Sequence, residues 1–180
     1  MHFRAQAAAL LLTAGLAPAA EPPPIAVTVA SADDVLLDPP GDGAARRASL
    51  SSAELALRQA MLASLSNLVS GAGPLTGTGP GPWRAHAEIL ECVSPDELRG
   101  AFGQGTPGIA VHASLCDISR GDSIPIARAD FPEPAQRLSA AKSSRVLPAE
   151  EAARKISAWI IGEISAAIGK STPPRQGNSP

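Results

Sequence analysis

Aromatic residues are scarce in this chain of 180 residues: they make up 3% of it, and tyrosine is absent. Proteins that bind single-stranded nucleic acid stack bases on aromatic side chains, so the composition argues against such a platform. A basic excess is missing too, because 15 Lys and Arg stand against 17 Asp and Glu, for a net charge of −2. Since phosphate backbones attract clustered positive charge, nucleic acid is not an expected partner.

Motifs of catalysis are also missing. The Gly/Pro-rich stretch 71–82 lacks the Gly-Lys-Ser/Thr ending of a phosphate-binding loop, and the chain has no Gly-x-Ser-x-Gly sequence. Its two cysteines, Cys92 and Cys116, are too far apart for a Cys-x-x-Cys redox pair. We therefore expect no enzyme, with no catalytic residue, no cofactor and no metal ion.

The N-terminus has the pattern of a secretory signal peptide. Arg4 precedes a short apolar stretch, Ala7 to Leu16, and the small residues Ala17-Pro18-Ala19 form a cleavage site. The apolar stretch is shorter than the roughly 20 residues that span a bilayer, which argues against the alternative of a membrane anchor. We expect residues 1–19 to be removed, leaving a periplasmic protein without a transmembrane segment.

The rest of the chain predicts a single α+β domain over residues 20–170 and a disordered tail over residues 171–180. Alternating apolar residues predict strands, and apolar residues at helical spacing predict helices. The strands are expected at 25–30, 83–93, 108–118 and 123–131, and the helices at 51–70 and from Pro148 to about Ile168. The order β-α-β-β-β-α suggests a small, mostly antiparallel sheet of about four strands with two helices packed on one face.

Two features of the helices carry more specific predictions. Ser51 and Glu54 have the spacing of a capping box, which places the start of the first helix there. The last helix carries a broad apolar stripe that includes Trp159, Ile160 and Ile164. Such a stripe serves either the core or a partner, so these three residues are the candidate interaction surface.

The cysteines and histidines of the strands form the other candidate site. Strict alternation puts Cys92 and Cys116 on one face of neighbouring strands, and an oxidising periplasm favours a disulfide over two unpaired thiols. His86 and His112 share that face. His86 and Cys92 would lie about 20 Å apart along a strand, whereas a zinc ion needs every ligand within about 2.3 Å. The histidines are therefore expected on a solvated or hydrogen-bonded face.

The order and spacing of the elements resemble a bacterial envelope family, the ABC-type transport auxiliary proteins, which work beside lipid-transporting ABC and MCE systems. The matching stretches are 50–69, 83–93, 109–131 and 150–168. The resemblance implies a non-enzymatic periplasmic accessory or assembly protein that docks on an envelope lipid-transport complex, with lipid as a further candidate ligand. This chain departs from the family's lipoproteins, because no Cys near the cleavage site offers a lipid anchor.

The alternative function is a small periplasmic ligand- or metal-binding protein, or an enzyme. It would use the face that carries His86, His112, Cys92 and Cys116.

Overall fold

The computed structural model describes residues 25–38, 40, 42–71, 83–98, 101, 106–120, 124–137 and 141–171. The predicted signal peptide, residues 1–19, lies outside these ranges, as do residues 172–180 of the predicted tail. Ser171, which was expected to begin that tail, is the last residue of the final helix.

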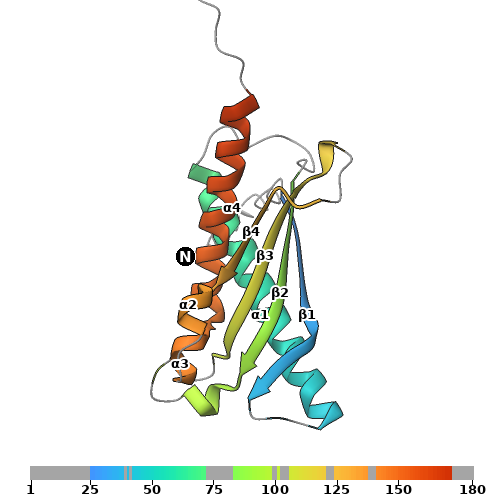
Figure 1. The fold of residues 1–180 in the computed structure, drawn as a ribbon, viewed down its shortest axis with the longest axis vertical. Helices are drawn as coiled ribbons and strands as arrows, with labels where there is room; N and C mark the ends of the chain where they lie inside the picture. Colours follow the sequence, from blue (N-terminus) through green and yellow to red (C-terminus); the bar gives the residue numbers. More distant parts are fainter. Residues whose placement is uncertain are drawn as a thin grey trace, which may run out of the picture.

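The described elements make a small α+β fold, as predicted (Figure 1). The strands are β1 (Ile25–Asp38), β2 (Trp83–Val93), β3 (Gly108–Asp117), β4 (Ala127–Phe131) and β5 (Leu147–Pro148). The two long helices are α1 (Gly43–Gly71) and α4 (Ala149–Ser171). Short helices complete the chain: η2 (Pro95–Leu98), η3 (Ile118–Arg120), α2 (Pro134–Arg137) and α3 (Lys142–Arg145).

The sheet has the strand order β1-β2-β3-β4, with β5 paired to β3. β2, β3 and β4 form the predicted antiparallel meander. β1 instead runs parallel to β2, because α1 carries the chain back to the starting end of the sheet between these two strands. Both long helices pack on the same face, and both run from one end of the sheet to the other (Figure 1).

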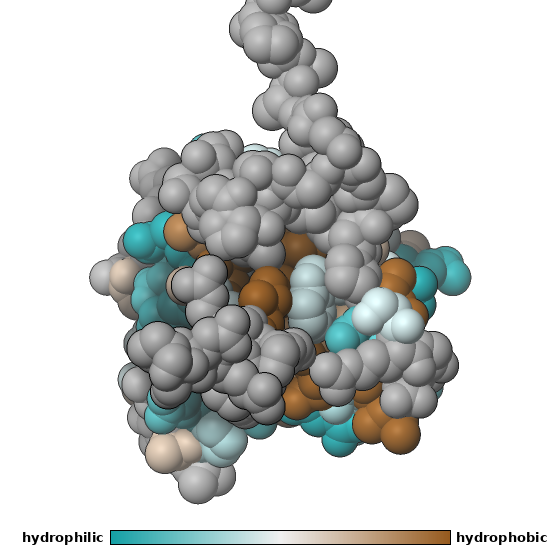
Figure 2. All heavy atoms as spheres, turned by 90° about the horizontal axis from the view of Figure 1, so that it is seen from above, coloured by the Kyte–Doolittle hydropathy of each residue, from teal (hydrophilic) through white to brown (hydrophobic). Residues whose placement is uncertain are grey.

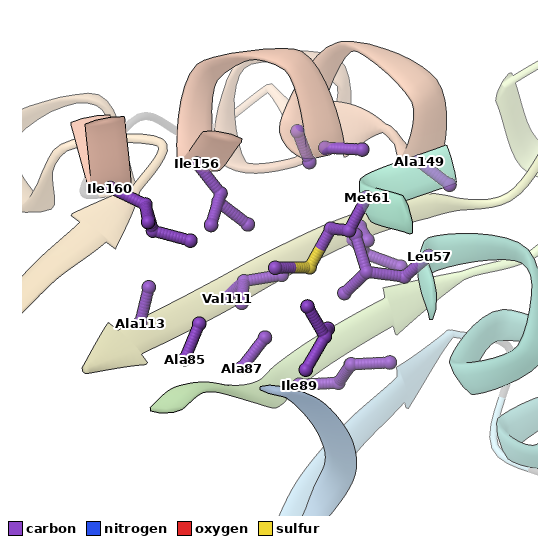
Figure 3. Close-up of a cluster of buried hydrophobic side chains, with 14 of the residues drawn as sticks. Leu57, Met61, Ala85, Ala87, Ile89, Val111, Ala113, Ala149, Ile156 and Ile160 are labelled. Atoms are coloured by element: carbon purple, nitrogen blue, oxygen red, sulfur yellow. The ribbon is translucent and has the colours of Figure 1, made fainter. Parts of the chain in front are cut away.

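The core lies between the helices and the sheet and consists mostly of aliphatic side chains (Figure 3). Leu57 and Met61 of α1 and Ile156 and Ile160 of α4 point into it and are completely buried. Small residues face them from the strands, among them Ala85, Ala87 and Ala113. Large and small side chains alternate in the space between the layers, and Trp83 is the buried aromatic residue of this core.

The first helix begins earlier than predicted, at Gly43 rather than near Ser51. Asp42 caps it: its Oδ1 accepts hydrogen bonds from the backbone N–H groups of Ala44 at 3.1 Å and Ala45 at 2.9 Å. The predicted capping box is wrong, because Ser51 lies inside the helix and Glu54 accepts a hydrogen bond from the Ser31 hydroxyl at 2.6 Å.

A second, smaller core covers one end of the sheet on the face opposite the long helices. It consists of Val93, Leu98, Ala110 and Val146. Next to it, the guanidinium of Arg145 lies 3.2 Å from the carboxylate of Glu91, whose side chain is almost fully buried. The short helices α2 and α3 follow β4 along the chain, and α3 leads directly into Val146 of this core.

Candidate functional site

The face of the sheet opposite the helices carries the predicted histidines. His86 and His112 come from the adjacent strands β2 and β3. Nδ1 of His86 lies 2.9 Å from Oγ1 of Thr28, and Nδ1 of His112 lies 2.6 Å from Oδ1 of Asp130. Both histidines are therefore on a hydrogen-bonded, partly solvated face, as predicted.

The ionisable side chains of this face are spread over separate rows of the sheet. Glu88, His112 and Asp130 occupy one row, whereas Cys116 lies two rows away, opposite Arg84. Within the described ranges, no group of three or more His, Cys, Asp and Glu side chains could hold a metal ion. The metal-binding form of the alternative function therefore gains no support from the described residues of this face.

Cys92 does not share this face, which corrects the prediction. The ladder between β2 and β3 pairs Ile89 with Val111 but Glu91 with Ala110, so Leu90 is an extra residue in β2. A bulge of this kind reverses the alternation of all residues that follow it. Cys92 consequently faces the long helices and belongs to the main core.

The predicted disulfide between Cys92 and Cys116 is also wrong, and both thiols are free. Cys92 pairs with Ile109 and Cys116 with Arg84, so the cysteines lie near opposite ends of the sheet, about 23 Å apart at 3.3 Å per residue along β3. A disulfide needs Cα atoms within about 7 Å. Burial disfavours the thiolate and raises the pKa of Cys92 from 9.0 to about 11, so this thiol is unreactive at neutral pH.

The candidate interaction surface on the last helix is wrong as well. Ile160 and Ile164 are 0% exposed and belong to the main core. Trp159 is half-buried, and its ring packs edge-on against Phe131, with 6.1 Å between the centroids. These residues hold α4 on the sheet.

Two hollows lie beside α1. A groove of about 820 Å³ runs between α1 and α4 and is lined by small side chains, among them Ala56, Ala60 and Ala158. A pocket of about 440 Å³ lies at the start of α1, where Arg46 and Asp38 are its charged lining residues and Cys92 its thiol. The Arg46 guanidinium donates a hydrogen bond to the backbone oxygen of Val35 at 3.0 Å.

Exposed hydrophobic side chains gather at one end of the molecule. Of the seven large hydrophobic residues that the described ranges leave exposed, five lie where α1 and α4 end and β4 begins. We call this the apolar end; its residues are Leu68, Ile118, Ile124, Ile126 and Ile168. Ile124 is the most exposed of them, at 72%. Figure 2 looks down on this end and shows hydrophobic side chains at its centre and toward one edge.

Sequence reasoning missed the apolar end because its residues are far apart along the chain. One signal was available: Ile124 and Ile126 flank Pro125 in the predicted strand 123–131. Proline cannot donate to a ladder, and the observed strand β4 begins only at Ala127. The two isoleucines therefore lie before the strand, outside the core.

Comparisons with known proteins add little. No family model matches the chain, and no curated protein matches it. Among solved structures, the chain is similar to the crystal structure of protein XCC0632 from Xanthomonas campestris, of the family DUF330. The two are 14% identical, the likeness covers 82% of this chain and 88% of the other, and the TM-score is 0.38. A likeness this weak establishes no shared fold, so function rests on this chain's own residues.

No helix in the described part of the chain is long and apolar enough to cross a membrane.

Proposed function

We propose that this protein is a non-enzymatic accessory protein of the periplasm, which docks through its apolar end on an envelope lipid-transport complex. The observation that carries the proposal is the concentration of exposed aliphatic side chains at that end. Apolar patches of this kind on a folded domain are typical of interaction sites, because exposure to water costs free energy that a partner recovers. The signal-peptide pattern and the family resemblance support the compartment and the class of partner.

The chemistry of the apolar end indicates the partner's surface. Arg84 and Arg128 are exposed on the first rows of the sheet beside this end. A matching surface therefore has an apolar centre and acidic residues at its rim. Trp and Tyr are the side chains that anchor proteins at a bilayer interface, whereas Trp83, the tryptophan at this end, is buried. These features favour a protein surface over a lipid surface.

Affinity capture with a matched pair of variants tests the proposal. The full chain, tagged at its C-terminus, is crosslinked in cells, purified from envelopes in mild detergent and analysed by mass spectrometry. We expect membrane components of a lipid-transport complex in stoichiometric yield. The yield captured by the variant Ile124→Ser/Ile126→Ser should be at least about tenfold lower, since truncating one of the few residues that dominate an interface costs about 2 kcal/mol or more. Leu36→Ser is the control, because Leu36 is 61% exposed at the other end.

Two outcomes would contradict the proposal. Capture of transport components that is unchanged by Ile124→Ser/Ile126→Ser would mean that another surface docks. Binding of the purified protein to vesicles of anionic phospholipid, lost in the same variant and without any captured protein, would mean that the apolar end binds lipid.

A further inference from the structure

The outer edge of β1 is an unpaired sheet edge. Within the described part of the chain, β1 pairs with β2 alone, over the regular stretch Ile25–Ser31 and, after a shift of register, over Leu36–Asp38. Figure 1 shows β1 at the margin of the sheet. Soluble proteins usually protect such edges with charged residues, prolines, bulges or very short strands. The stretch from Ile25 to Ser31 has none of these, and at seven residues it is longer than the average strand.

We infer that this edge pairs with the same edge of a second copy of the chain, in an antiparallel and two-fold symmetric way. A strand is self-complementary under a two-fold axis, because each residue that contacts a given position is contacted by it in return. The inference is independent of the proposed function, since it uses a different surface.

The faces of the sheet restrict the register of this pairing. Ile25, Val27 and Val29 face the helices. Residues that pair across a ladder share a face, so an axis that passes through a residue keeps the helices of both copies on the same face. An axis between two residues would pair a residue that faces the helices with one that faces away, which a two-fold axis perpendicular to the sheet does not allow.

The length of the regular strand then selects the central residue. Residues 22–24 are prolines, which lack the N–H that a ladder requires. At the other end, the register with β2 shifts after Ser31, so the regular strand stops there. The longest ladder is therefore centred on Thr28. It pairs Ile25 with Ser31, Ala26 with Ala30, Val27 with Val29 and Thr28 with itself.

An exposed side chain on α1 supports the same partner. Glu54 lies on the β1 side of α1, since it accepts the hydrogen bond from Ser31. At 100° per residue, Leu55 and Leu62 fall near that flank, whereas Ala56 and Ala60 line the groove toward α4. Leu55 is 56% exposed and lies outside the apolar end. Pairing of the β1 edges brings this flank of α1 next to the same flank of the second copy.

Antiparallel pairing has a consequence for the shape of the dimer. The two copies run in opposite directions, so their apolar ends lie at opposite ends of the pair. Such a dimer can hold one docking partner at each end.

Cysteine crosslinking tests both the pairing and its register. In the full chain carrying Cys116→Ser, Thr28→Cys should form a disulfide dimer under mild oxidation, because directly opposed residues have Cβ atoms about 5 Å apart. Ala26→Cys is the matched control on the same strand. Its two copies would be four residues apart, about 13 Å, so it should stay monomeric. Combining Ala26→Cys with Ala30→Cys should restore the crosslink.

The mass in solution provides a second readout. Light scattering coupled to size exclusion should give twice the chain mass for the unmodified protein, and one chain mass for Thr28→Lys with unchanged circular dichroism. A monomer at micromolar concentration without the substitution would overturn the inference, as would equal crosslinking of Thr28→Cys and Ala26→Cys.

Discussion

The two ends of this molecule differ in their side chains: one end pairs polar side chains within the chain, and the other exposes apolar side chains. At the end where β1 stops and α1 begins, polar side chains have partners within the chain, such as Asp42 with the first turn of α1 and Arg145 with Glu91. We call this the charged end. At the apolar end, Ile118, Ile124 and Ile126 are exposed. Residues of the charged end are expected to stabilise the fold, whereas those of the apolar end are available to a partner.

Measurements of unfolding free energy test this difference between the two ends. The largest effect is expected for Arg145→Met at the charged end. Glu91 would keep a buried carboxylate without its cation, which destabilises folded proteins strongly. Because Arg145 is partly solvated, we expect a loss of about 2 to 3 kcal/mol of unfolding free energy in urea denaturation. Adding Glu91→Leu should restore most of the lost unfolding free energy. A loss below about 0.5 kcal/mol would show that the pair does not hold this end together.

The next effect concerns Cys92, which lies near the charged end. Its pKa is raised from 9.0 to about 11 by burial, so the folded state retains the proton that the unfolded state releases. The contribution of the buried, protonated thiol to the unfolding free energy is complete below pH 9 and is lost as the pH rises toward 11. By pH 10 the loss relative to Cys92→Val should be about 1.4 kcal/mol. Identical pH dependence of the two proteins in thermal unfolding would contradict the burial of this thiol.

A smaller effect is expected for Asp42→Ala. The substitution removes the acceptor for two N–H groups at the start of α1. Loss of an N-cap costs about 1 kcal/mol, which chemical denaturation resolves. Asp33→Ala is a suitable control, because Asp33 is an exposed carboxylate of β1. Equal stability of the two variants would mean that Asp42 does not cap the helix.

The smallest effect is expected at the apolar end. Ile124→Ser should change the unfolding free energy by less than about 0.5 kcal/mol, because the side chain is 72% exposed and contributes little to the core. A loss above about 1 kcal/mol would place Ile124 among the residues that maintain the fold, and the contrast between the two ends would disappear.

Local patterns predicted the class and order of the fold but not its irregular features. Alternation located β2 and β3, and it placed His86 and His112 on the correct face. It failed for Cys92, because the bulge at Leu90 depends on how β2 pairs with β3, and no local pattern shows that pairing. The parallel pairing of β1 likewise follows from the path of α1.

The apolar stripe on α4 shows a second limit of prediction from the sequence. Trp159, Ile160 and Ile164 have the spacing of a helix face that must be covered, and the sequence cannot say by what. The structure shows that Ile160 and Ile164 are covered by the protein's own core. Predicting the apolar end would have required the tertiary arrangement of the chain, since this end combines residues from α1, η3, α4 and the segment before β4.

Site-specific photocrosslinking in cells tests the central claim most directly. A photoreactive amino acid is placed at position 124, at the apolar end, or at position 36, near the charged end, where the natural side chains are similarly exposed. Position 124 should crosslink to a membrane component of a lipid-transport complex, and position 36 should not. Equal crosslinking to that component from both positions, or crosslinking from position 36 alone, would contradict docking through the apolar end.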